Sequence, residues 1–112
     1  MRAIAISLFC LGVIGCGAAR QSEPLVGVVQ FTPSARAGRK VYAEHCYPCH
    51  PAGEAGVGPA LNNKPVPGAA IKLQVRKGFG AMPAFDDKII DDRQLEDVVA
   101  YLKEQRGHGR RR

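Results

Sequence analysis

Two cysteines three residues apart, Cys46 and Cys49, are followed at once by His50, and this short run restricts the folds open to the chain. The residues after it, up to position 64, are rich in proline and glycine and show no helical or alternating pattern. Such a long structureless stretch is unusual inside a compact domain unless it binds something. A chain of 112 residues forms one domain at most, and small domains often rely on a metal, disulfide or cofactor for stability. We therefore expect this loop to surround a bound group.

The run from Cys46 to His50 reads Cys-Tyr-Pro-Cys-His, which is the CxxCH signature of covalent haem attachment. Two thiols at this spacing can bond to the two vinyl groups of one haem, and the histidine can place its imidazole on the iron. A thioredoxin-like thiol pair and half of a zinc site stay open as alternatives. The first requires a βαβ pattern, and the second requires four ligands, for which only His45 and His108 remain as further histidines.

The first 19 residues have the pattern of a secretory signal peptide. Met1 and Arg2 form a positive start, residues 3–15 are uncharged and mostly apolar, and the next charge is Arg20. The apolar run is short for a membrane span, which takes about 20 residues. An uncleaved signal anchor is the alternative. We expect an exported domain, either periplasmic or anchored with its face towards the periplasm or the cell exterior.

Two cleavage sites fit this segment. Residues 13–16 resemble the lipobox of bacterial lipoproteins, which predicts that Cys16 is lipidated and becomes the first residue of the mature chain. A diacylated cysteine gives stable membrane anchoring. Ordinary cleavage after Ala18 or Ala19 is the other site. In both cases the CxxCH motif holds the only cysteines of the folded domain.

The mature chain divides into a linker at 20–31, a domain at 32–106 and a basic tail at 107–112. With 46% hydrophobic and 23% charged residues, the composition is that of a globular protein. Thr32 and Pro33 predict the start of a helix over 33–45. A second helix is predicted over 68–77, closed by Gly78. A third follows Asp91, which forms a capping box with Gln94, and its apolar stripe is Leu95, Val98, Val99 and Leu102.

Four motifs in order resemble the class I c-type cytochromes, in particular the small bacterial ones with one haem. Gly38, Tyr42 and Cys46 match the family's N-terminal helix, and the others are Gly58-Pro59-Ala60-Leu61, Gly80-Ala81-Met82-Pro83 and Val98-Val99-Ala100-Tyr101-Leu102. The resemblance covers residues 35–105. It implies an all-α cytochrome c fold, with three or more short helices and long loops around one covalent haem.

The resemblance also implies roles for the site residues. Cys46 and Cys49 form the thioether links, and His50 and Met82 are the axial ligands of the iron. A methionine ligand favours reduced iron and raises the potential. The Pro59 carbonyl accepts the His50 Nδ1–H bond and fixes the ring's tautomer. A flexible core residue is the alternative role of Met82, and an ordinary Gly-Pro turn is that of Pro59.

The chain departs from the family pattern in two places. The interval from His50 to Pro59 is short, and the chain has no tryptophan to bond a haem propionate, a role that we assign to Arg76 or Lys77. His45 is expected to turn outward from its helix. Ligation of the iron by His108, in the tail, is the minor alternative to Met82.

The formal net charge of +6 favours an acidic partner. Lys72, Arg76 and Lys77 precede the methionine segment, and we expect them to steer docking on acidic redox proteins. A solvated helix face is the simpler interpretation of these charges. Nucleic acid is disfavoured, because the chain is exported and has no binding motif for it.

These observations predict a one-electron carrier in a respiratory or dehydrogenase-linked chain. No acid–base pair or nucleophile stands out, so we expect no enzymatic activity of its own, although the chain can serve as a subunit of an oxidoreductase. Two alternatives differ in kind. One is a haem sensor or small peroxidase-like protein with an open sixth position, and the other is a haem-free thiol or zinc protein.

Overall fold

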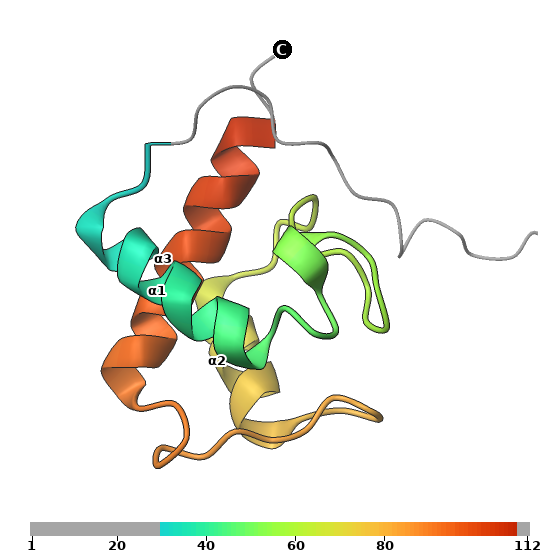
Figure 1. Cartoon of the computed structure of the whole chain (residues 1–112). Helices are drawn as coiled ribbons and strands as arrows, with labels where there is room; N and C mark the ends of the chain where they lie inside the picture. The colour runs from blue at the N-terminus through green and yellow to red at the C-terminus, as the bar shows by residue number, and fades with distance from the viewer. Residues whose placement is uncertain (1–29, 110–112) are drawn as a thin grey trace, which may run out of the picture.

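The computed structural model describes residues 30–109, with the side chains of 30–106. The elements are α1 (Pro33–His45), the short 3₁₀ helix η2 (Pro51–Gly53), α2 (Gly68–Lys77) and α3 (Asp92–Gly109), joined by long loops (Figure 1). These elements confirm the predicted all-α fold. The predicted signal peptide with Cys16, most of the linker and residues 110–112 lie outside the described residues.

Each helix begins or ends where local chemistry predicts. The Thr32 hydroxyl accepts the Ala35 N–H at 3.3 Å, and Pro33 occupies the first turn of α1. At α3, Asp91 Oδ1 accepts the Gln94 N–H at 2.7 Å, while Gln94 Oε1 accepts the Asp91 N–H at 2.9 Å. This reciprocal pair is the capping box expected from the sequence.

Helices α1 and α3 cross in close contact, as Figure 1 shows. Gly38 makes this approach possible, because a Cβ atom built on it would lie 1.9 Å from the Asp97 backbone oxygen. The rings of Tyr42 and Tyr101 pack beside the crossing with their centroids 5.2 Å apart. The buried core at this crossing comprises Ala35, Tyr42, Val98, Tyr101 and Leu102.

A second, smaller core joins α2 to the start of α3. Its buried members are Val75, Ile90 and Leu95. Val41 and Ile71 pack against both cores, so the two are continuous. The three α-helices therefore pack around one continuous hydrophobic core.

Two boundaries differ from the predicted ones. Phe31, assigned to the linker, packs on Tyr101 with a centroid distance of 5.3 Å. The backbone of α3 continues to Gly109, so the first three residues of the predicted tail are helical. None of the helices in the described part of the chain is long and apolar enough to cross a membrane.

Candidate functional site

A cavity of about 540 Å³ opens between the helices and the loops. It is lined by residues from the end of α1, the loop after it, α2, the segment before α3, and α3 itself. All of the predicted haem-site residues lie on its wall: Cys46, Cys49, His50, Pro59 and Met82. The fold thus brings the CxxCH motif and a methionine distant in the sequence to a single space.

His50 is held from three sides. Its Nδ1 lies 2.8 Å from the Pro59 carbonyl oxygen. A carbonyl can only accept, so Nδ1 carries the proton and Nε2 keeps its lone pair, which is the form of a metal ligand. A Cβ atom on Gly58 would lie 2.2 Å from the imidazole Cε1, so only glycine leaves room for the ring. The Tyr42 hydroxyl donates to the His50 carbonyl.

The chain reverses tightly after His50. Ala52 and Gly53 both have positive φ angles, +51° and +77°. The Gly53 N–H donates to the Tyr42 hydroxyl at 3.1 Å, and the Gln105 side-chain amide donates to the Ala52 carbonyl. This reversal accommodates the short interval between His50 and Pro59 noted in the sequence.

The role of Gln105 was not predicted from the sequence: this residue is completely buried on α3 and also donates to the Tyr101 hydroxyl at 3.3 Å. Its position offered a signal. Gln105 continues the helical spacing of Val98 and Leu102, so a polar side chain stands on the apolar face of the helix. A polar group at such a place needs a buried partner.

Cys46 and Cys49 are not joined by a disulfide, and both lie partly buried on the cavity wall. Burial, and to a lesser degree the neighbouring Cys49, raises the pKa of the Cys46 thiol to about 11. Cys46 therefore stays protonated at neutral pH. Among the described residues, no group of three or more histidine, cysteine or acidic side chains is arranged to hold a metal ion. The zinc alternative therefore has no four-ligand set in this part of the chain.

Met82 is positioned by a tight turn. Its N–H donates to the Phe79 carbonyl at 2.9 Å, and its carbonyl accepts the Phe79 N–H at 3.0 Å. Gly80, inside the turn, has a φ of +57°. The Met82 side chain lines the cavity and also packs against the core of Val75. Turn geometry, rather than core packing alone, sets its place.

The predictions for His45 and for the pair Arg76 and Lys77 need correction. His45 does not turn outward: it lines the cavity, and its ring lies 5.8 Å from that of Phe85, because the last turn of α1 faces the loop before α3. Arg76 and Lys77 do not line the cavity. Arg76 is engaged instead with backbone carbonyls and with Asp92. Lys64 and Arg106 are the lysine and arginine on the cavity wall. The side chain of His108 lies outside the described residues.

These residues fit a covalent haem. Most of the cavity lining is apolar, two thiols stand at one side, and a histidine whose Nδ1 is bonded to a carbonyl adjoins them. A side chain at position 58 would collide with the imidazole, so the glycine leaves room for the ring beside the thiols. The donor set therefore matches haem attachment through two thioethers and one imidazole.

Comparisons with known proteins point to the same class. The family described as "Cytochrome C oxidase, cbb3-type, subunit III" matches residues 33–102. Over 65 residues the chain is 46% identical to the 4-cresol dehydrogenase [hydroxylating] cytochrome c subunit of Pseudomonas putida, covering 58% of this chain and 57% of that protein. The chain thus spans little more than half the length of that relative.

Relatives of a second kind align over a larger share of their length. Cytochrome c6 of Gloeothece citriformis is 38% identical over 87 residues, covering 70% of this chain and 78% of that protein. Cytochrome c6 of Bryopsis maxima is 39% identical over 75 residues, which are 58% of this chain and 84% of that protein.

Fold, site and relatives together define a small c-type cytochrome with one haem. The chain belongs to the family described as cytochrome c oxidase, cbb3-type, subunit III. It carries a covalent haem c and is an electron carrier. These relatives indicate an exported protein.

Proposed function

We propose that the chain shuttles single electrons with His50 and Met82 as the two axial ligands of its haem iron. The observation that carries this proposal is the shared cavity, whose wall includes both side chains and both thiols. When bound, haem supplies the one-electron Fe(III)/Fe(II) couple. The protein must hold the two ligand side chains in fixed positions and exclude water from the haem site.

The protein's contribution begins with orientation. The Pro59 carbonyl keeps the proton of His50 on Nδ1 and leaves Nε2 for the iron. The turn from Phe79 to Met82 holds the thioether on the wall of the same cavity. A thioether ligand stabilises reduced iron, so this pair of ligands favours a high potential.

Two cations are candidates to balance the haem carboxylates. Lys64 and Arg106 line the cavity, and the Arg106 guanidinium also donates to the Lys64 carbonyl and, at 3.1 Å, to that of Val66. These bonds tie the end of α3 to the loop before α2. We assign to this pair the role that the sequence analysis gave to Arg76 or Lys77.

The partner is inferred from charge and from the relatives. A relative that is a dehydrogenase cytochrome subunit supports a dehydrogenase as electron donor. Lys72 and Arg76 are paired with Glu96 and Asp92, whereas Lys77 has no ion pair with the described residues. Docking on an acidic partner would therefore rely on Lys77 first. Lipidation of Cys16, or cleavage after Ala18 or Ala19, would decide whether the carrier is anchored or free in the periplasm.

The test is a comparison of spectra and potentials for the holoprotein and Met82→Ala. The wild type is expected to give a c-type pyridine adduct and, when oxidised, the Met–iron absorption band. Met82→Ala should keep the covalent haem, lose the band, bind carbon monoxide and lower the midpoint potential by on the order of 0.1–0.3 V, within the range of about 0.8 V that axial ligands span. Ile89→Ala is the control, since Ile89 lies between α2 and α3 as Met82 does, is 48% exposed and does not line the cavity.

An oxidised spectrum that is the same in the wild type and Met82→Ala would contradict methionine ligation and favour a sensor or a peroxidase-like protein. A chain purified from cells with an intact attachment system but without covalent haem would leave the thiol alternative. Loss of the band in Ile89→Ala as well would mean that the connecting segment, and not the thioether alone, decides the spectrum.

A further inference from the structure

The Met82 loop, residues 78–91, connects α2 to α3 and contains the proposed iron ligand. Within it, Asp86 Oδ1 accepts the N–H groups of Lys88 and Ile89 at 3.0 and 3.1 Å, and the Asp86 carbonyl accepts the Ile90 N–H at 3.0 Å. Residues 86–90 therefore form a closed turn of their own. Phe85, which directly precedes this turn, lies three residues after Met82 in the chain.

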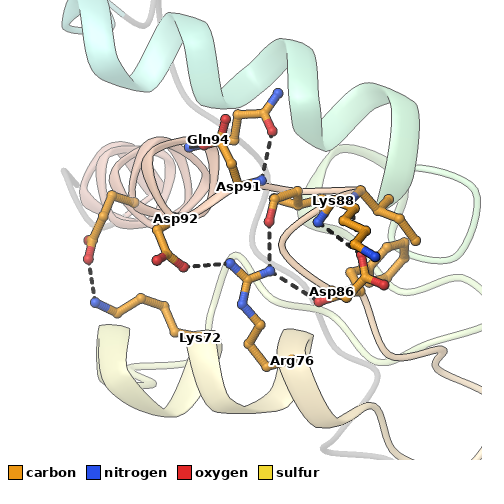
Figure 2. Close-up of polar contacts among 11 residues, drawn as sticks. Lys72, Arg76, Asp86, Lys88, Asp91, Asp92 and Gln94 are labelled. Carbon is orange, nitrogen blue, oxygen red and sulfur yellow. Dashed lines mark hydrogen bonds and ion pairs between the residues drawn. The ribbon is translucent and has the colours of Figure 1, made fainter.

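One side chain outside the loop holds both ends of that turn. The Arg76 guanidinium, from the last turn of α2, donates through Nη1 to the carbonyls of Phe85 at 3.1 Å and Ile90 at 2.6 Å. Through Nη2 it contacts Asp92 Oδ1 at 2.7 Å. Figure 2 shows the guanidinium between the Asp92 carboxylate and the loop backbone, with Lys72 one turn away.

Backbone contacts complete the attachment. The Phe85 N–H donates to the Val75 carbonyl at 2.9 Å. Gly78 has a φ of +68° and no side chain, so the backbone of residues 82–84 can pack directly against it. A Cβ atom at this position would lie 2.7 Å from the Met82 backbone oxygen. The segment with Met82 is thus confined between Gly78 on one side and the residues that Arg76 holds on the other.

We propose that Arg76 is a positioning residue that locks the Met82 loop onto α2 and so keeps the Met82 thioether at the haem iron. The inference rests on the proposed ligation by Met82. Arg76 does not line the cavity, so it acts through the loop backbone and not on the haem. The sequence suggested a haem carboxylate or a docking partner for this cation, whereas the structure assigns its bonds to the loop.

Only a guanidinium suits this place. It offers several N–H groups in a fixed plane, so one side chain reaches two carbonyls and one carboxylate together. A lysine ammonium is a single point on a flexible stem and cannot span the three acceptors in the same way. The Asp92 side chain is 94% exposed, so its ion pair with Arg76 contributes little stability. The bonds from Arg76 to the two backbone carbonyls therefore hold the loop.

The test measures how readily imidazole displaces the sixth ligand in the oxidised holoprotein, followed by the Met–iron band during titration. Imidazole binds when the loop releases Met82, so its affinity reports the opening of the loop. Arg76→Gln should raise the apparent imidazole affinity by about tenfold or more, as expected from the loss of two bonds from a charged donor. Arg76→Lys keeps the positive charge but loses the planar guanidinium. Its apparent imidazole affinity should lie between those of the wild type and Arg76→Gln.

Two control variants separate the lock from charge and from stability. Lys72→Gln removes the same charge from the same face of α2 and breaks its ion pair with Glu96, yet leaves the loop bonds intact. Asp92→Asn removes the exposed carboxylate and keeps the two carbonyl bonds. Both should bind imidazole within about twofold of the wild type, since exposed pairs contribute little.

The outcomes separate this inference from the proposed ligation. A wild type that shows the Met–iron band, together with equal imidazole affinity in Arg76→Gln and Lys72→Gln, overturns the lock and leaves Met82 as ligand. A wild type without the band overturns both. If Arg76→Gln does not fold, Arg76→Lys decides, and an affinity equal to that of Lys72→Gln counts against the inference.

Discussion

At the scale of single residues, Tyr42 shows how one atom can join the helices to the site. Its hydroxyl donates to the His50 carbonyl and accepts the Gly53 N–H at 3.1 Å. Its ring packs on Tyr101 in the main core. The backbone on both sides of the tight reversal after His50 is therefore fastened to α1 by a single side chain.

The buried hydroxyl also predicts a pH dependence. Burial raises the pKa of Tyr42 well above its ordinary value of 10.0. The neutral form is favoured in the fold, so its stabilising effect is complete below about pH 10 and declines as the pH rises further. We expect the free energy of unfolding of the wild type, measured in urea, to fall above that pH.

Tyr42→Phe should lose about 1–3 kcal/mol at pH 7, the cost of leaving the Gly53 N–H and its neighbours without a partner. Its stability should also fall less steeply above pH 10, with a remaining slope from Tyr101, whose pKa is likewise raised by burial. Tyr47→Phe is the control, because Tyr47 is 51% exposed. Equal slopes in the wild type and Tyr42→Phe would be inconsistent with this assignment.

At the scale of elements, the crossing of α1 and α3 is set by a missing side chain. Alanine is a better helix former than glycine by about 1 kcal/mol. At Gly38 this gain is outweighed, because the new Cβ atom would meet the backbone of Asp97 and Val98, which cannot rotate away. Packing between helices, and not helix propensity, therefore decides the residue at this position.

We predict that Gly38→Ala destabilises the holoprotein by about 3 kcal/mol or more, as the helices must separate. Gly68→Ala is the matched control. A Cβ atom there would meet only side-chain atoms of Val99 and Lys103, which can adjust. Thermal unfolding followed by circular dichroism at 222 nm compares the two. Similar melting temperatures for both variants would show that the crossing tolerates a methyl group.

At the scale of the whole molecule, the haem is a part of the core. The cavity of about 540 Å³ is lined by residues of all three α-helices. Without haem, the apolar side chains around this space would lose their packing partners and face water. A small domain has little stability to spare for such a loss.

We therefore expect the chain without haem to lose its tertiary structure. The double variant Cys46→Ala, Cys49→Ala, expressed without attached haem, should show reduced helical signal and no cooperative thermal transition. The holoprotein measured in the same buffer is the reference. A sharp transition in the variant, at a temperature near that of the holoprotein, would mean that the helices are stable without the cofactor.

Much of this molecule follows from local sequence. The bounds of α1 and α2 agree with those predicted, because Thr32, Pro33 and Gly78 act on the residues next to them. The capping box at Asp91 and the CxxCH motif each involve residues that are close in the sequence. Their roles can therefore be predicted without knowledge of the fold. The positions of Met82 and Pro59 relative to His50 are supported by the shared cavity and the bond to Pro59.

The tertiary structure alone decided which acceptors the long polar side chains meet. Arg76 precedes the methionine segment in sequence, but its bonds go to Phe85, Ile90 and Asp92. Gln105 lies on an apolar stripe and bonds a carbonyl 53 residues away. A flexible cation or amide has many partners within reach along a chain, and only the packed helices bring one set close. Sequence by itself therefore determined the cofactor and the helices, while the fold determined what holds the ligand loops in place.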